Sequence, residues 1–204
     1  MTSRQLSEWK GEFGNDYIVR NPSSEESVRR RAQAFAQMLR PLAQEQPATI
    51  LEVGANIGHN LRALQRISSA QLMAVEPNAV ARQQLLDGVL PVQCVHDASA
   101  EQLPFSDSSV DLVFTCTVLI HVPDDELNRA CDEIFRVARR HILLIEYFSP
   151  RKETVSYRGH GDMLFKRDYG GIFMDRHPLR LLDYGFFWKR VSDLDDVNFW
   201  LLEK

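Results

Sequence analysis

Three carboxylates and one histidine stand in or just after short apolar runs of this chain, where a folded sheet would bring side chains together. Glu52 lies in the first run, Glu76 and Asp97 follow the next two, and His121 comes soon after a fourth. Carboxylates accept hydrogen bonds from hydroxyl and amino groups and attract cations, and a histidine can take up a proton near neutral pH. The pattern predicts a site for a ligand with hydroxyl and cationic groups.

A glycine turn follows the first apolar run. Gly54 and Gly58 lack side chains where the backbone must approach a ligand or turn with positive φ, and Asn56 is the non-glycine type that best tolerates a left-handed conformation. From Ile57 onward, apolar residues recur at helical spacing, so the free N–H groups of a helix start point back into the turn. We therefore expect a strand, a turn and a helix, with an anionic or hydroxyl-rich group in the turn.

The residues around this turn distinguish between nucleoside cofactors. A carboxylate at the tip of the second strand, here Glu76, binds ribose hydroxyls in open α/β sheets. A nicotinamide dinucleotide needs small residues near its pyrophosphate, whereas His59 fills the place of close approach and Glu52 adds a repelling charge. S-adenosylmethionine fits better, because it combines ribose hydroxyls with an ammonium and a sulfonium. A nicotinamide-dependent oxidoreductase and a chance surface glutamate are the alternatives.

Composition limits the fold and the partners. The chain has 204 residues, 44% of them hydrophobic and 25% charged, which predicts one soluble globular domain. The net charge of −4 argues against general nucleic-acid binding. Cys94, Cys116 and Cys131 lack metal-ligand spacing, so we expect no metal, free thiols and a cytoplasmic location. We also expect no signal peptide and no membrane span.

Strands and helices alternate along the chain until a final pair of strands. This order predicts an α/β fold, a Rossmann-like, doubly wound, mostly parallel seven-stranded sheet with an antiparallel edge strand. The expected strands are 49–53, 72–75, 91–95, 110–116, 141–148, 186–191 and 197–202. Helices are expected from 57, over 80–86, from 124 and over 177–185, the last ended by Gly185. The single domain 1–204 would comprise a lid and helix (1–40), a cofactor-binding core (41–146), and an acceptor-binding segment with closing strands (147–204).

The N-terminal segment 9–22 is dense in aromatic residues, glycine and asparagine, which suits neither a long helix nor a regular strand. We expect a structured lid there, and the alternative is a docked arm whose aromatic side chains cover the core. A helix should then start after Ser24 and stop near Pro41. Its solvated face would carry Arg29, Arg30 and Arg31.

The chain resembles the class I S-adenosylmethionine-dependent methyltransferases. This resemblance covers 49–146 and rests on four motifs in order: Glu52-x-Gly54-x-Asn56-x-Gly58, Glu76, Asp97-Ala98 with Leu103-Pro104-Phe105, and Val118-Leu119-Ile120-His121. The wider chain is similar to the methylases associated with pseudaminic acid biosynthesis. That second resemblance rests on Trp9-x-Gly11-x-Phe13-Gly14-x-x-Tyr17-x-x-Arg20-Asn21, Arg158-Gly159-His160, Leu164-Phe165-Lys166-Arg167-Asp168 and Asp183-Tyr184-Gly185-Phe186. Asn56 departs from the middle glycine of many of these enzymes, which the turn tolerates.

The resemblance implies an enzyme that uses S-adenosyl-L-methionine and releases S-adenosyl-L-homocysteine. It assigns the ribose to Glu76, the adenine to Asp97 and Ala98, and the methionine ammonium to the backbone at Cys116 and Thr117. Tyr17 and Arg20 would close over the methionine carboxylate. The expected cofactor-binding residues are Tyr17, Arg20, Glu52, Gly54, Asn56, Gly58, Asn60, Glu76, Pro77, Asp97, Ala98, Cys116 and Thr117.

His121 and Tyr147 are the candidate catalytic residues. Methyl transfer from a sulfonium is an in-line displacement, and a hydroxyl or ammonium acceptor must lose a proton, for which His121 is best placed. Tyr147 could orient the acceptor. The alternatives are a histidine that caps a helix and a tyrosine that packs against the lid. A non-catalytic cofactor-binding module that serves a partner protein is the competing function.

Residues 151–180 carry an excess of positive side chains in a chain that is acidic overall. Guanidinium groups suit the recognition of carboxylates and phosphates, and the family commonly builds acceptor pockets in this part of the chain. We expect a small anionic acceptor, such as an acidic sugar, a nucleotide-linked sugar or another carboxylated or phosphorylated metabolite, methylated on oxygen. Its expected binding residues are Tyr157, Arg158, His160, Lys166 and Arg167, and a solvated loop is the alternative.

Overall fold

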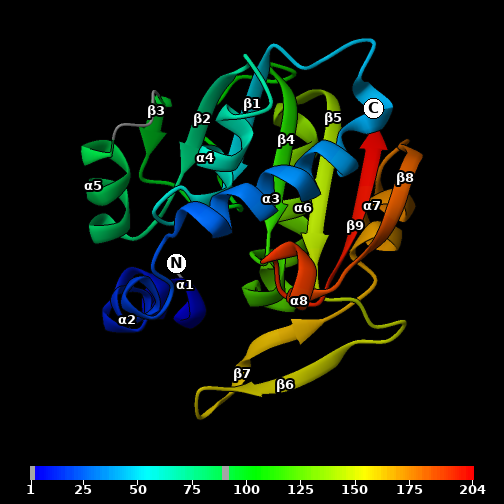
Figure 1. Ribbon diagram of the computed structural model, residues 1–204. Helices are drawn as coiled ribbons and strands as arrows, with labels where there is room; N and C mark the ends of the chain where they lie inside the picture. Colours follow the sequence, from blue (N-terminus) through cyan, green and yellow to red (C-terminus); the bar gives the residue numbers. More distant parts are fainter. Residues whose placement is uncertain (1–2, 89–91) are drawn as a thin grey trace.

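A seven-stranded sheet with the order β3-β2-β1-β4-β5-β9-β8 forms the centre of the molecule (Figure 1). The computed structural model describes residues 3–88 and 92–204. The strands are β1 (Thr49–Val53), β2 (Gln71–Val75), β3 (Val92–His96), β4 (Val110–Cys116), β5 (Ala138–Glu146), β8 (Arg180–Phe187) and β9 (Val197–Glu203). Strands β1 to β5 pair in parallel, and β9 runs antiparallel to both β5 and β8. The predicted α/β fold is confirmed, with its antiparallel strand next to the outermost strand. Pro91, where the third strand was expected to begin, lies outside the described residues.

Helices cover both faces of the sheet because its central strands are apolar on both sides. In β4, six of the seven residues are buried. On one face, α3 (Glu25–Met38) and α4 (His59–Gln65) enclose a core around Phe35. On the other, α6 (Asp124–Val137) and α7 (Tyr169–Arg176) enclose a second core around Ile134. The helix α5 (Ala79–Asp87) follows β2. Two buried faces are the arrangement expected of a parallel sheet.

Residues 4–20 contain two short helices, α1 (Arg4–Lys10) and α2 (Glu12–Arg20), which lie beside the carboxyl ends of the parallel strands (Figure 1). The segment 9–22 was expected to suit neither a long helix nor a regular strand, and it contains two short helices that meet at Gly11. Phe13 and Tyr17, four residues apart, share one face of α2, and Trp9 of α1 packs against both. The ring centroids of Trp9 and Phe13 lie 5.1 Å apart, and those of Trp9 and Tyr17 lie 5.3 Å apart. Helical spacing of the aromatic residues thus outweighs the glycine content.

The long helix α3 agrees with the prediction at both ends. The Ser24 hydroxyl accepts a hydrogen bond from the Ser27 N–H, and the short helix η1 (Arg40–Leu42) begins where α3 stops. Arg29 and Arg30 pair with Glu26 at the surface. Arg31 departs from the prediction of a solvated face, because it is half-buried and turned towards α4.

A hairpin of β6 (Glu153–Tyr157) and β7 (His160–Lys166) projects from the carboxyl ends of the strands (Figure 1). The sequence analysis predicted no strands in this basic segment. Arg158 and Gly159 make the turn with φ values of 53° and 84°, as the two central residues of a tight hairpin turn require. Beyond it comes α8 (Lys189–Ser192), where the sixth strand was expected to continue.

The prediction of a helix over 177–185 was wrong. The strand β8 occupies Arg180–Phe187, and the helix α7 lies earlier, at Tyr169–Arg176. Pro178 prevents a helix from continuing through this point. Gly185 is no helix cap. A Cβ atom there would lie 2.7 Å from the ring of Phe199, so the glycine lets β8 approach β9 closely.

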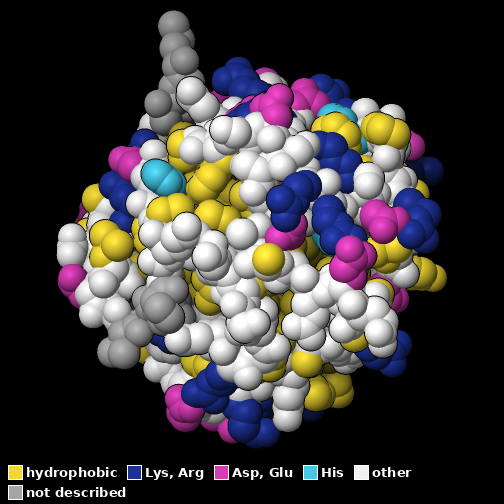
Figure 2. All heavy atoms as spheres, turned by 90° about the horizontal axis from the view of Figure 1, so that it is seen from above, with side chains coloured by type: hydrophobic (Ala, Val, Ile, Leu, Met, Phe, Trp, Pro, Cys, Tyr) yellow, Lys and Arg dark blue, Asp and Glu magenta, His cyan; other side chains and the backbone are white. Residues whose placement is uncertain are grey.

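The face opposite α1 and α2 carries mixed charges. In Figure 2, Lys and Arg side chains lie beside Asp and Glu side chains on this face. Ion pairs near the amino ends of the strands join Arg140 to Glu45 and Arg180 to Glu203. No helix in 3–88 or 92–204 is long and apolar enough to cross a membrane.

Candidate active site

A cavity of about 320 Å³ lies at the carboxyl ends of β1, β2 and β4, beneath α1 and α2. This is the edge at which open α/β sheets bind ligands, and the volume lies within the usual range for small-molecule sites. The structure brings together nine of the thirteen residues predicted to bind the cofactor and one of the two predicted catalytic residues. Those that line the cavity are Tyr17, Glu52, Gly54, Asn56, Asn60, Glu76, Pro77, Cys116, Thr117 and His121.

The glycine turn has the predicted left-handed backbone. The φ values are 77° at Gly54, 49° at Asn56 and 80° at Gly58, which forms the N-cap of α4. A Cβ atom at Gly54 would lie 2.6 Å from a methyl group of Val118, so the loop after β4 packs directly on the turn. The Asn56 side chain accepts a hydrogen bond from the Ile57 N–H, which stabilises the asparagine in this conformation.

Glu76 holds the turn from the next strand. Its carboxylate accepts hydrogen bonds from the Asn56 N–H at 2.7 Å and from the Asn78 N–H at 2.8 Å. The residue is 7% exposed and lines the cavity. Burial raises the pKa of this carboxyl above its usual value. Because each carboxylate oxygen has a further lone pair, Glu76 can also accept hydrogen bonds from a ligand.

Glu52 carries a buried carboxylate oxygen without a protein partner. Its Oε1 atom accepts a hydrogen bond from the Asn60 amide at 2.7 Å, whereas Oε2 is buried and unpaired among the described residues. Burial raises the pKa of Glu52 to about 8. The Arg31 guanidinium donates to the Asn60 side-chain oxygen at 2.7 Å, and its Nε atom lies 3.6 Å from an Asp193 oxygen. A ligand cation would satisfy the free oxygen.

His121 ends the short helix η2 (Leu119–His121) in the cavity wall. Its Nδ1 atom lies 2.5 Å from the Met163 carbonyl oxygen in β7, so this nitrogen must carry a proton and donate it. The Nε2 atom of the neutral ring is then free to accept a hydrogen bond or a proton. The ring packs 4.6 Å from Trp9 and 5.5 Å from Tyr157 between centroids, and burial lowers the pKa of His121 to about 4.

Glu146, at the end of β5, fixes the loop that presents His121. Its fully buried carboxylate accepts hydrogen bonds from the N–H groups of Val118, Leu119 and Ile120 at 3.2–3.3 Å. Burial raises the pKa of Glu146 to about 7. The free N–H groups at the start of η2 thus have a carboxylate partner, as helix starts require. Glu146 was not among the predicted site residues.

Tyr147 does not line the cavity, but it contacts a residue that does. Its hydroxyl donates to an Asp195 oxygen at 2.9 Å, and the Lys189 ammonium lies 2.7 Å from the other oxygen. Burial and the neighbouring Asp195 raise the pKa of Tyr147 above its usual value, so it cannot serve as a base near neutral pH. The predicted role of Tyr147 in orienting the acceptor stays a prediction.

Four predicted cofactor residues lie outside the cavity wall. The Arg20 guanidinium lies over the Phe13 ring and 3.8 Å from Asp16, so Arg31 supplies the cavity's guanidinium in its place. Asp97 is exposed and pairs with Arg82 at 3.1 Å and with Lys10 at 3.6 Å. Instead of Asp97 and Ala98, the cavity is lined by the residues just after them, Ser99, Ala100 and Glu101. Gly58 shapes the turn without lining the cavity.

None of the five predicted acceptor-binding residues lines the cavity. Arg158 is exposed at the hairpin tip, and Lys166 lies in β7. His160 lies 3.4 Å from the Arg4 guanidinium, and Tyr157 packs against Phe13 and His121.

The fifth of these residues, Arg167, is buried within the protein. It donates to the Val122 carbonyl at 3.2 Å and to the Tyr169 hydroxyl at 3.0 Å, and it pairs with Asp124 at 2.8 Å. With these contacts it supports the cavity wall at Val122 from behind.

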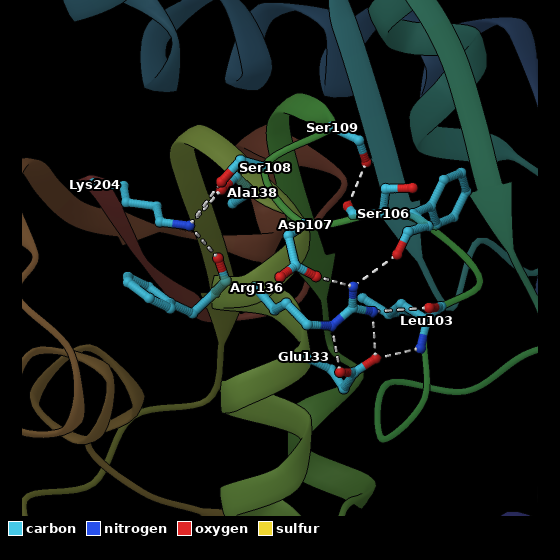
Figure 3. A network of polar contacts seen from close by, with 11 residues as sticks. Leu103, Ser106, Asp107, Ser108, Ser109, Glu133, Arg136, Ala138 and Lys204 are labelled. Atoms are coloured by element: carbon cyan, nitrogen blue, oxygen red, sulfur yellow. Dashed lines mark hydrogen bonds and ion pairs between the residues drawn. The ribbon is translucent and has the colours of Figure 1, made fainter.

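A polar network centred on Arg136 holds the loop that follows β3 (Figure 3). The guanidinium of Arg136 donates to the Leu103 and Phe105 carbonyls and to Asp107, and it pairs with Glu133 one turn earlier on α6. Glu133 in turn accepts from the Leu103 N–H at 2.8 Å. This network fixes the loop whose earlier residues, from Ser99 onward, line the cavity.

Replacing Arg136 by alanine should lower the free energy of unfolding by about 1–2 kcal/mol, because charge-assisted hydrogen bonds to the loop are lost. Urea denaturation followed by tryptophan fluorescence measures the change. The exposed Arg129, replaced by alanine on the same helix, is the matched control. Equal stability of the two variants would show that the network does not hold the loop.

Comparison with known proteins agrees with this geometry. Residues 51–145 match the family model described as a methyltransferase domain, and they span β1 to most of β5, including the glycine turn, Glu76 and His121. Residues 51–145 are thus similar to a methyltransferase domain. A curated relative, dimethylglycine N-methyltransferase from Parasynechococcus marenigrum, is 34% identical over 100 residues, which cover 47% of this chain and 35% of that protein. The chain thus matches about a third of that relative's length.

Solved structures share the fold of the methyltransferase domain across the whole chain. A SAM-dependent methyltransferase from Leishmania major has a TM-score of 0.75 and 16% identity, covering 98% of this chain and 87% of its own. Magnesium protoporphyrin IX methyltransferase from Synechocystis PCC 6803 was solved with bound S-adenosylmethionine. It has a TM-score of 0.70 and 11% identity, and the match covers 100% of this chain and 98% of that one. The predicted class I methyltransferase fold is confirmed.

Proposed function

We propose that this protein transfers a methyl group from S-adenosylmethionine to a small-molecule acceptor. The observation that carries the proposal is the free Oε2 atom of Glu52, a buried carboxylate oxygen in the cavity wall of a methyltransferase domain. A buried, unpaired carboxylate oxygen requires a cation or a hydrogen-bond donor, and the ammonium of the cofactor's methionine part is both. The glycine turn and Glu76 offer the second half of the site.

The residues present fit this cofactor group by group. Glu52 would hold the ammonium, and Arg31 is the lining guanidinium with the chemistry to hold the methionine carboxylate. Glu76 has free lone pairs for the ribose hydroxyls. We propose that the loop from Ser99 to Glu101 covers the adenine.

The chain's own part in the reaction is positioning and the exclusion of water. Bound in this cavity, the cofactor supplies an electrophilic methyl group on a sulfonium. Trp9 and Tyr17, on α1 and α2, line the cavity and shield it from solvent. Glu146 fixes η2, so that His121 is held with its protonated Nδ1 on the Met163 carbonyl and its Nε2 available to accept a proton from the acceptor.

The acceptor class needs separate treatment. An acidic sugar or another anionic acceptor, methylated on oxygen, is the expectation from the basic residues of 151–180 and from the resemblance to the pseudaminic acid-associated methylases. This geometry does not support it, because Arg158, Lys166 and Arg167 stand outside the cavity wall. We therefore propose methyl transfer to a small-molecule acceptor whose chemistry is set by the groups that do line the cavity.

Isothermal titration calorimetry with S-adenosylmethionine, S-adenosylhomocysteine and NAD tests the proposal. We expect the first two to bind and to raise the melting temperature through linkage, because they bind the folded state. Binding of NAD without either of the others would reverse the assignment in favour of an oxidoreductase. Cofactor binding with no release of S-adenosylhomocysteine on any acceptor would favour a non-catalytic module that serves a partner.

A further inference from the structure

The carboxylate of Asp195 lines the cavity and contacts one tyrosine and one lysine. It accepts a hydrogen bond from the Tyr147 hydroxyl at 2.9 Å and pairs with the Lys189 ammonium at 2.7 Å. Tyr17 lines the same cavity as Asp195, and burial, with the nearby Tyr157 and Asp195, raises the pKa of its hydroxyl above its usual value. Lys189 is an exposed and flexible partner, with 68% of its side chain accessible, so the ion pair is weak and exchangeable.

Aromatic rings face the same part of the cavity. Trp9, Tyr17 and His121 all line it, and the Trp9 ring packs 5.3 Å from that of Tyr17 and 4.6 Å from that of His121. His121 stays uncharged near neutral pH, because burial lowers its pKa to about 4. A set of neutral rings next to a carboxylate is the arrangement that attracts an organic ammonium, through cation–π contacts and charge.

The charge of the whole lining points the same way. Among its described residues, the cavity lining carries five carboxyl groups, of which Glu52 is largely protonated at neutral pH in the free protein, against two cations, Arg31 and Lys189. Arg31 is already engaged by Asn60 and Asp193, and Glu52 and Glu76 serve the cofactor under the proposed function. Asp193 accepts a hydrogen bond from the Ser27 hydroxyl and pairs with Arg31, and Glu101 lies in the loop that the proposed function assigns to the adenine. Asp195 is then the carboxylate left for a second ligand, and an anionic acceptor would approach it against repulsion.

We propose that the acceptor is an amine, held as its ammonium by Asp195 and by the rings of Trp9 and Tyr17, and methylated on nitrogen. This inference rests on the proposed methyl transfer. The ammonium first gives one proton to Nε2 of His121, which passes it to water. The nitrogen lone pair then forms the bond to the methyl carbon, while the carbon–sulfur bond of the donor breaks and its electron pair stays on sulfur. The products are a methylated ammonium, which now carries the positive charge, and a neutral thioether.

The first experiment compares choline with its neutral isostere 3,3-dimethylbutan-1-ol. Both have the same shape, but only choline carries a quaternary ammonium, and neither has a nitrogen lone pair to methylate. Calorimetry on the protein saturated with S-adenosylhomocysteine should show choline binding about tenfold more tightly, the range that cation–π and charge contacts supply. Equal binding of the two, or binding of neither, would overturn the ammonium site.

Variants assign the selectivity to residues. We expect Asp195→Asn and Trp9→Leu to remove most of the preference for choline. The matched controls, Asp196→Asn in the same loop and Trp188→Leu on the surface, should keep it. Lys189→Met should strengthen choline binding, because it removes the cation that competes for Asp195. Weaker choline binding in Lys189→Met, or stronger binding of acetate, would instead mark Lys189 as the holder of an anionic acceptor.

Turnover separates this inference from the function on which it rests. N,N-dimethylethanolamine should release S-adenosylhomocysteine, and its carbon isostere 3-methylbutan-1-ol should not. If S-adenosylmethionine binds and only alcohols or carboxylates are methylated, the amine assignment fails while methyl transfer stands. If S-adenosylmethionine itself does not bind, the proposed function fails first.

Discussion

Replacing Glu76 by alanine is expected to lower the affinity for S-adenosylmethionine by about ten- to a hundredfold, or ~1.5–3 kcal/mol. Two effects add. The ribose hydroxyls lose a charged acceptor, and the N–H groups of Asn56 and Asn78, now bonded at 2.7 and 2.8 Å, lose the partner that holds the turn. Calorimetry of both proteins with S-adenosylmethionine measures the change.

Two further variants show where the effect comes from. Asp97→Asn changes an exposed carboxylate at the next strand tip, which pairs with Arg82 outside the cavity wall, and should bind the cofactor nearly as the parent does. Glu76→Gln keeps the shape and one acceptor oxygen and should give an intermediate loss. Cofactor binding by Glu76→Ala that equals the parent would remove Glu76 from the ribose site and leave it a purely structural role.

The part of the site nearest the glycine turn could be predicted because its signals are local. A strand, a left-handed turn and a helix start occupy fewer than twenty consecutive residues, and each position has its own steric requirement. Gly54, Asn56 and Gly58 all adopt positive φ, as their types indicate. Glu76 follows from the same logic one strand later, since parallel strands end at one edge.

The residues that sequence reasoning missed reach the cavity through distant packing. The sequence of α3 predicts an exposed Arg31, and its contact with Asn60 arises because α4 packs against α3. Asp195 lies between two strands at the end of the chain, and its contacts with Tyr147 and Lys189 follow from the loop's path. The only local signal for Arg31 is that the helix already has Arg29 and Arg30 for its exposed face.

The basic segment shows why composition alone misplaces a site. Its positive charge is real, but hairpin and helix geometry spread it over separate surroundings, with Arg158 at a tip and Arg167 in the interior. Burial in β7 does not alternate, because Met163, Leu164 and Phe165 are all buried, so this segment lacks the period of two that indicates a half-exposed strand. A count of charges does not say where the charged side chains lie, whereas the period of a strand says which face of the sheet each side chain occupies.

The affinity for S-adenosylmethionine is expected to rise with pH between about pH 6 and pH 8, by up to tenfold per pH unit. Burial raises the pKa of Glu52 to about 8, so the free protein is largely protonated there at neutral pH. An ammonium beside Oε2 favours the ionised carboxylate and lowers this pKa in the complex. Binding then releases a proton, and linkage makes affinity grow with pH until Glu52 is already ionised in the free protein.

The same Glu52 carboxyl makes the folding stability of the free protein fall as pH rises, opposite to its effect on cofactor affinity. Because its pKa in the folded state is higher than the unfolded value of about 4.3, the folded state binds the extra proton between these values, and the stability from Glu52 falls as pH rises towards 8. Glu52→Gln, which keeps the Asn60 contact through its amide oxygen, should flatten both profiles and weaken the cofactor. Calorimetry and melting curves from pH 6 to 8 measure them. A parent affinity that is flat across this range would show that the ammonium does not sit on Glu52.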